Sequence, residues 1–146
     1  MRKQEVNMKV KLLSEDAYMP ERAHRDDAGA DLRTPVKFVL GAHESAVVDF
    51  GLAVEIPPGY YGELMSKSGL NVKHNIQCMG GVIDSGYTGT IKGRVTNNGD
   101  YDHVFYRGDK VMQLVIKPCL CCGFSEASEF DYETDRGEAG YGSTGR

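Results

Sequence analysis

The residues best suited to chemistry lie in a glycine-rich stretch at residues 80–89. It reads Gly80-Gly-Val-Ile-Asp84-Ser-Gly-Tyr87-Thr-Gly89, so a carboxylate and an aromatic ring stand three residues apart in an apolar hairpin. A partly buried carboxylate can accept a proton from water and serve as a general base. A purely structural interpretation fits equally well: Asp84 would serve a tight turn, and Tyr87 would fill the core.

The C-terminal stretch has a composition that suits a nucleotide. Tyr141 stands among glycines, with hydroxyls at Ser143 and Thr144 and arginines at positions Arg136 and Arg146. Glycine lets the backbone approach a ligand closely, and arginine binds phosphate well. The pattern predicts a flap that closes over a nucleotide, held by that ligand or by a neighbouring subunit. The alternative is a disordered terminus.

Three further patterns are weaker. Ser66-Lys-Ser-Gly-Leu70 joins a cation and two hydroxyls at an expected helix start, where free N–H groups attract anions. A capped helix start explains it as well. Asp31 lies between small residues just before an expected strand and suits a divalent cation, directly or through water, although a turn aspartate is the simpler interpretation. Gln113 is a single amide in an apolar strand, and a buried amide needs a partner, more often backbone than ligand.

Short apolar runs must position these side chains. They recur at intervals of roughly 8–12 residues between Gly, Pro and Asn, which is typical of an all-β sandwich or barrel. One short helix is expected over Ser68–His74. We expect one β-domain over residues 1–123 and a C-terminal arm over residues 124–146, where the composition becomes acidic and then glycine-rich. The expected strands are Met8–Leu13, Val36–Leu40, Ala46–Phe50, Leu52–Ile56, Tyr60–Met65, Ile91–Thr96, Val104–Tyr106 and Val111–Ile116.

Composition limits the partners. The chain has 146 residues and a formal net charge of -4, which argues against broad nucleic-acid binding because that depends on summed basic charge. No apolar run approaches the ~20 residues of a membrane span, and the polar start has no apolar signal region after it. We therefore expect a cytoplasmic protein with neither nucleic-acid nor membrane partners.

The four cysteines are Cys78, Cys119, Cys121 and Cys122. The Cys-x-Cys-Cys cluster raises the possibility of zinc, but no second Cys/His pair stands at ligand spacing. Reduced thiols on or after a buried strand are the favoured interpretation.

Taken together, five segments resemble the trimeric dUTP diphosphatase (dUTPase) family. They occur in the family's order and span residues 28–145. The resemblance implies a jelly-roll-like β-barrel or sandwich with a glycine-rich C-terminal arm. It also implies a homotrimer with active sites at subunit interfaces. The segments are Ala28-Gly-Ala-Asp-Leu32, Ser66-Lys-Ser-Gly-Leu70, Gly81-Val-Ile-Asp-Ser-Gly-Tyr87, Gly108-Asp-Lys-Val-Met-Gln-Leu114 and Arg136–Gly145.

The implied reaction is hydrolysis of dUTP to dUMP and pyrophosphate with Mg²⁺, which limits uracil in DNA and supplies dUMP for thymidylate synthesis. By resemblance, Asp84 orients and activates the attacking water and bonds the sugar 3′-hydroxyl. Tyr87 stacks on the deoxyribose, leaving no space for a 2′-hydroxyl. The backbone around Gly81, Val82 and Ile83, with Lys92, pairs with the uracil edge.

The remaining implied contacts are to the triphosphate, the metal and the base. Asp31 would hold a water on magnesium, and Tyr141 would stack over the base beside Gly142. The implied phosphate contacts are Lys67, Ser68, Gly69, Gln113, Arg136, Ser143 and Thr144.

The sequence departs from the family's usual pattern at four positions. Lys67 stands where arginine is usual, which keeps the charge but loses the bidentate fork. Gly86 replaces an acidic residue, and Ala139 replaces a glycine. Tyr141 replaces phenylalanine, so the stacking ring is retained. Two alternatives stay open: a deaminase-like enzyme acting on dCTP, and a dUTP-sensing module that engages a partner protein.

Overall fold

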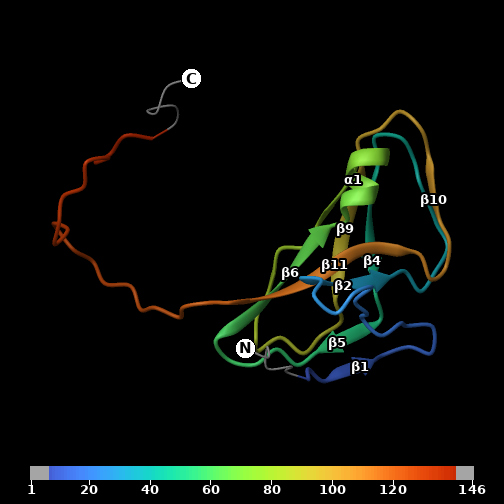
Figure 1. Cartoon of the computed structure of the whole chain (residues 1–146), viewed down its shortest axis with the longest axis horizontal. Coiled ribbons are helices and arrows are strands. Elements are labelled where there is room, and N and C mark those ends of the chain that lie inside the picture. Colours follow the sequence, from blue (N-terminus) through green and yellow to red (C-terminus); the bar gives the residue numbers. More distant parts are fainter. Residues whose placement is uncertain (1–6, 141–146) are drawn as a thin grey trace.

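The structure is a computed structural model that describes residues 7–140, and these are built mainly from short β-strands (Figure 1). One short helix accompanies them. In chain order the elements are β1 (Val10–Leu12), β2 (Gly29–Arg33), β3 (Phe38–Leu40), β4 (Ser45–Asp49), β5 (Leu52–Val54), β6 (Tyr60–Ser66), α1 (Ser68–His74), β7 (Ile76–Met79), β8 (Val82–Ile83), β9 (Lys92–Asn97), β10 (His103–Phe105) and β11 (Lys110–Pro118).

The strands form four antiparallel sheets. The largest has the order β2-β11-β6-β8, and a second has the order β4-β9-β7. Two-stranded pairs, β1-β5 and β10-β3, complete the set. Within residues 7–140 no sheet closes into a barrel. The prediction of an all-β chain with one short helix is confirmed.

Alternating burial explains why these segments form strands around one core. In β9 the side chains alternate between exposed and buried, and Val95 lies fully inside. In β7, Ile76 and Cys78 point inward from the same sheet. Leu32, Leu64 and Met112 come from the larger sheet and belong to the same buried cluster. The two sheets therefore share a single hydrophobic core.

Sequence reasoning placed eight of the strands and the helix close to where the structure has them. Three strands were not expected, although the two-residue β8 falls within the expected glycine-rich hairpin. We expected Asp31 to lie before a strand, but it lies inside β2, where Gly29 and Ala30 lack the bulky side chains that mark strands. Another unexpected strand, β7, is separated from α1 by Asn75 alone, so no Gly or Pro marks its start.

The helix α1 covers the predicted range but does not begin with a side-chain cap. Lys67 occupies the N-cap position without a capping hydrogen bond. At the other end Asn75 adopts a left-handed conformation with φ of 54°, and its N–H reaches the Asn71 carbonyl. The capped start that explained Ser66–Leu70 structurally is therefore wrong, and the Lys67 side chain is available for another contact.

The C-terminal arm leaves the domain after β11. Figure 1 shows it as an extended orange and red segment that runs away from the sheets. All its described residues from Cys119 to Gly140 are exposed. The boundary between residues 123 and 124 stays a prediction. No helix among residues 7–140 has the length and apolar character that crossing a membrane requires.

Candidate active site

A pocket of about 230 Å³ lies in the hairpin that follows β7. It is lined by five of the predicted site residues: Val82, Ile83, Asp84, Tyr87 and Lys92. The structure thus brings together the carboxylate, the aromatic ring and the cation of one predicted group. Gly80, which begins the same glycine-rich stretch, also lines the pocket, and sequence reasoning missed the other two lining residues, Thr90 and Ile91.

The hairpin holds Asp84 and Tyr87 in a tight turn. The Tyr87 backbone N–H donates to the Asp84 carbonyl at 3.0 Å. The Tyr87 hydroxyl donates to the Thr90 carbonyl at 2.9 Å, which fixes the ring across the turn. Because Tyr87 remains 45% exposed, the interpretation that it fills the core is wrong. Asp84 does stand in a turn and is exposed in the single chain, so the partial burial considered for it is absent here.

Glycines and one pair of strands set the shape of this hairpin. Strand β8 pairs with β6, with Ile83 opposite Gly62. A side chain at Gly80 would collide with Leu64, so only glycine lets the hairpin lie so close to β6. Gly81 has φ of +66°, which L side chains rarely adopt. By contrast, the space around Gly86 is open, so nothing in the packing requires glycine there.

Lys92 reaches the pocket from the start of β9 and is held by an acidic partner. Its ammonium lies 3.5 Å from Asp49. Asp49 also accepts hydrogen bonds from the Thr90 hydroxyl at 2.5 Å and the Gly51 N–H at 2.9 Å. Burial raises the pKa of Asp49, but these hydrogen bonds and Lys92 outweigh it and leave the pKa lowered. Thr90 therefore links the Tyr87 ring to the carboxylate that holds Lys92.

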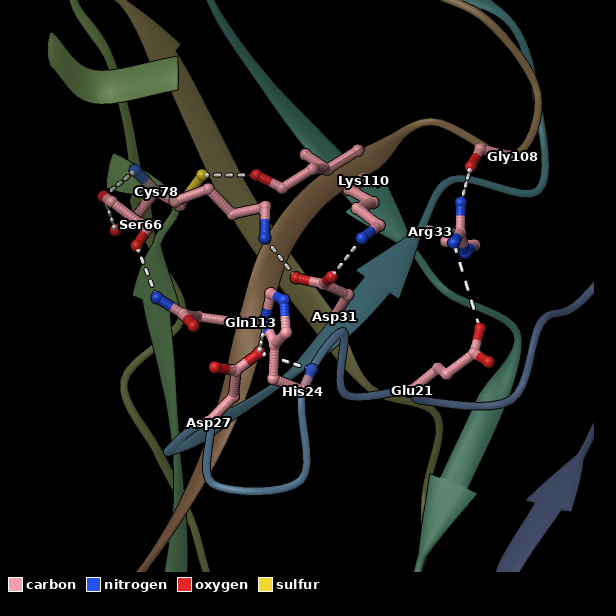
Figure 2. A network of polar contacts seen from close by, with 12 residues as sticks. Glu21, His24, Asp27, Asp31, Arg33, Ser66, Cys78, Gly108, Lys110 and Gln113 are labelled. Carbon is pink, nitrogen blue, oxygen red and sulfur yellow. Dashed lines mark hydrogen bonds and ion pairs between the residues drawn. The ribbon is translucent and has the colours of Figure 1, made fainter. Parts of the chain in front are cut away.

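A second group of predicted residues surrounds Asp31 on the larger sheet (Figure 2). Asp31 is 4% exposed, and each of its carboxylate oxygens contacts a different lysine. Lys67 pairs with Oδ1 from the end of β6, and Lys110 lies 2.6 Å from Oδ2 at the start of β11. Burial raises the pKa of Asp31, but hydrogen bonds from Lys110 and Lys67 more than compensate and leave the pKa below its usual value.

Gln113 lies beside this cluster, directly opposite Asp31 in the β11–β2 pairing. Its side-chain amide donates to the Ser66 carbonyl at 3.0 Å. The Ser66 hydroxyl in turn accepts the Cys78 N–H at 2.8 Å. The expected backbone partner for Gln113 is confirmed. These bonds join β11, β6 and β7 just before Ser68 and Gly69.

The two groups lie apart within one chain. Val82 of the hairpin pairs with Glu63, whereas the Asp31 cluster adjoins Ser66, three residues further along β6. Three residues of a strand correspond to about 10 Å. Arg136 lies out in the arm, where its Nε donates to the Ala139 carbonyl at 2.9 Å. Tyr141, Gly142, Ser143 and Thr144 lie outside the described residues, so their predicted roles stay predictions.

Lys110 is the most informative residue that sequence reasoning missed. It belongs to the segment Gly108-Asp-Lys-Val-Met-Gln-Leu114, whose resemblance implies no role for this lysine. The signal available was a cation at the start of a strand whose next residues are buried. Such a charge requires a partner, but the sequence does not indicate that the partner is Asp31.

Comparison with known proteins agrees with this geometry. The family model for dUTPase matches residues 15–145. A deoxyuridine 5′-triphosphate nucleotidohydrolase from Clostridium acetobutylicum is 39% identical over 142 residues, which cover 96% of this chain and 97% of that protein. A mitochondrial deoxyuridine 5′-triphosphate nucleotidohydrolase from Dictyostelium discoideum is 40% identical and covers 94% of this chain and 76% of that protein.

Solved structures give the same assignment. The dUTPase of Staphylococcus bacteriophage 80alpha, determined with dUPNHPP, has a TM-score of 0.87 and 34% identity, with 96% of this chain and 99% of that chain covered. A mutant dUTPase of phage phi11 of S. aureus, described with a structural Mg(II) ion, has a TM-score of 0.81 and 33% identity, with 87% and 100% covered. The five motifs, the hairpin pocket and these matches agree, and the chain belongs to the dUTPase family.

Proposed function

We propose that this chain hydrolyses dUTP to dUMP and pyrophosphate and is thus a dUTP diphosphatase. The single observation that carries the proposal is the hairpin pocket, which unites Asp84, Tyr87 and Lys92 in a chain of this family. The named relatives act on deoxyuridine triphosphate, and this substrate is assigned here on that basis. The reaction would limit uracil in DNA and supply dUMP in the cytoplasm.

The hairpin would bind the deoxyuridine and position the attacking water. Asp84 is exposed at the pocket, where its carboxylate would orient the water and accept its proton. Tyr87, held by Thr90, would present its ring to the deoxyribose and exclude a 2′-hydroxyl. The backbone around Gly81, Val82 and Ile83 would read the uracil edge, and close packing against β6 would leave no room for a thymine methyl.

The Asp31 cluster would receive the phosphates. Lys67, Ser68 and Gly69 follow one another from the end of β6 into α1, and Gln113 of β11 reaches the Ser66 carbonyl beside them. Phosphoryl transfer depends mainly on positioning and on neutralising spread-out negative charge. Lys67 would exchange its contact with Asp31 for a phosphate oxygen, so the cluster would gain substrate contacts without leaving a lysine unpaired.

The donor set near Asp31 fits magnesium only through water. Asp31 supplies the hard oxygen ligands that Mg²⁺ prefers, but Lys110 holds Oδ2, and only Oδ1 would become free when Lys67 turns to the phosphate. Asp31 would therefore hold a magnesium-bound water rather than the metal, with the triphosphate as the main chelator. Magnesium, when bound, would neutralise phosphate charge.

We further propose a homotrimer in which each active site forms between subunits. The arm, which carries Arg136, runs away from its own domain (Figure 1). It would bring Arg136, Tyr141, Gly142, Ser143 and Thr144 to a neighbour's site.

Pyrophosphate release from dUTP, dTTP, dCTP and UTP tests the proposal. We expect release from dUTP and background rates with the other three. Ammonia should be measured in parallel with dCTP, because its release would identify a deaminase instead. Binding of dUTP without any turnover would contradict the enzymatic assignment and favour a regulatory module.

A further inference from the structure

Three of the four histidines gather at one end of the molecule, away from the hairpin pocket. His74 ends α1, His103 begins β10, and His43 lies in the loop between β3 and β4. Figure 1 shows α1 and β10 together at this end. A cavity of about 250 Å³ lies here, lined by both His74 and His103 and by Asp100 and Asp102.

The His74 and His103 imidazoles lie against each other. Their ring centroids are 4.9 Å apart, and the rings are tilted by 56°. His103 also packs on Phe105 at 4.6 Å, which supports the ring from the core side. Among the described residues, neither imidazole takes part in a hydrogen bond or ion pair, unlike His43, which contacts Asp100 at 3.1 Å. The ring nitrogens of the pair are thus free to bind a ligand.

The spacing of the two rings suits one metal ion between them. A histidine nitrogen lies about 2.0–2.1 Å from zinc, which places each ring centre roughly 3.2 Å from the ion. Two such rings at the tetrahedral angle have centres about 5 Å apart. The observed 4.9 Å agrees with this separation. Imidazole is also a ligand that zinc, nickel and copper favour over magnesium.

We propose that His74 and His103 form a two-imidazole binding site for a divalent transition-metal ion of the zinc class. No group of three His, Cys, Asp or Glu side chains in residues 7–140 converges as a ready metal site, so water would complete the coordination. Asp100 and Asp102 line the same cavity and would offset the charge of the ion. Asp102 is already held by the Ala42 N–H at 2.9 Å, which favours an outer position for this carboxylate.

Such an ion would tie the C-terminal end of α1 to β10. Two elements that already meet through the packed histidine rings would then also be linked by coordinate bonds, and the folded state would gain stability from the bound ion. The site differs from the proposed magnesium position in both place and chemistry, since it offers nitrogen rather than carboxylate donors. It does not rest on dUTP hydrolysis.

The exposed Cys119, Cys121 and Cys122 are the rival ligands for zinc. They lie where the arm leaves β11, whereas the histidine pair stands on two elements anchored to the core. The histidine pair is favoured because its rings are already in contact in the folded chain.

Metal titration of the metal-stripped, untagged full-length chain tests the proposal. Zn²⁺ uptake and the visible spectrum of bound Co²⁺ should both report one ion per chain in the wild type. We expect His74→Asn and His103→Gln to weaken zinc binding by at least about tenfold, since each removes one of two protein ligands. His24→Asn is the matched control, because His24 is exposed in the loop before β2, and it should bind as the wild type does.

Thermal unfolding gives a second readout. Zinc should raise the melting temperature of the wild type and of His24→Asn but not that of His74→Asn, whose circular dichroism should remain normal because His74 is exposed. Unchanged zinc binding in both histidine variants would overturn the proposal. So would binding that survives in them but disappears when Cys119, Cys121 and Cys122 are replaced by serine.

Discussion

At the scale of single residues, the candidate site depends on how each charged group is held. Asp84 is exposed at the pocket, with its backbone fixed by the turn to Tyr87. Asp31 is the opposite case, a buried carboxylate shared by two lysines. The two aspartates therefore carry different proposed roles, one acting on water and the other organising the phosphate side.

Asp84→Asn should separate catalysis from binding. The amide has nearly the same shape but cannot accept a proton, so kcat should fall by about 100-fold or more, the usual scale of a lost general base. Binding of an uncleavable dUTP analogue, measured by calorimetry, should stay near that of the wild type. Turnover close to normal in this variant would remove Asp84 from its proposed role.

Lys110→Met should make the protein more sensitive to acid. The pKa of Asp31 is lowered in the folded chain, so its contribution to stability is fully present above pH 3.8 and is lost as the pH falls through the folded value. Removing one lysine raises that folded pKa, so the midpoint of acid unfolding should move to higher pH.

At neutral pH, Lys110→Met should also lower the free energy of unfolding by about 1–2 kcal/mol. This is less than the ~3–5 kcal/mol lost when a fully buried ion pair is broken, because Lys67 remains and Lys110 is partly exposed. Acid and urea unfolding followed by circular dichroism measure both effects. Lys110→Arg is the control and should retain most of the stability. Equal acid midpoints for the methionine variant and the wild type would show that Lys110 does not influence Asp31.

At the scale of elements, the close approach of the hairpin to β6 determines the shape of the pocket. This approach depends on Gly80, where any side chain meets Leu64. Strands β8 and β6 pair at only two positions, Ile83 with Gly62 and Val82 with Glu63. A small displacement would therefore separate the hairpin from β6.

Gly80→Ala should therefore destabilise the protein and weaken dUTP binding. Overpacking of this kind costs about 1–3 kcal/mol, and a displaced hairpin should raise KM. Gly86→Ala is the matched control. Because the space around Gly86 is open, the stability of this variant should stay close to that of the wild type. Urea unfolding and steady-state kinetics measure the two effects. Equal losses in both variants would contradict the importance of the Leu64 contact.

Sequence periodicity predicted most of the strands, three-residue ones included, but it missed β2, β7 and β8. The alternation of β9 and the long apolar run of β11 are clear in the sequence, and the predicted helix Ser68–His74 has the bounds that the structure shows. Strand β2 was missed because its glycine and alanine have low strand propensity, and pairing with β11 overrides that preference. Propensity is local, whereas pairing partners come from elsewhere in the chain.

At the scale of the whole molecule, the arm decides whether one chain suffices. Its described part extends away from the domain that precedes it (Figure 1). If it closes over a neighbour's nucleotide, it acts chiefly in the transition state, as flaps commonly do.

Removing residues 136–146 should lower kcat more than it weakens binding of the dUTP analogue, because interactions specific to the transition state affect turnover first. Mixing the truncated chain with the Asp84→Asn chain tests the crossing directly. The truncated chain keeps Asp84 but lacks the end of the arm, and the Asp84→Asn chain keeps the arm but lacks the carboxylate. Mixed trimers should therefore regain activity that neither chain has alone. Unchanged turnover after truncation would contradict the flap, and mixtures without any gain would place the arm on its own subunit's site.

The sequence by itself determined the strand pattern, the short helix, the family and the identity of the site motifs, because these depend on residue type and short spacing. The tertiary structure decided which side chains meet. Asp31 and Lys67 lie 36 residues apart yet form an ion pair, Lys110 completes the cluster, and His74 contacts His103. It also separated the hairpin pocket from the phosphate cluster. Such contacts depend on how distant strands pair and pack, and the local sequence does not indicate which distant segments will meet.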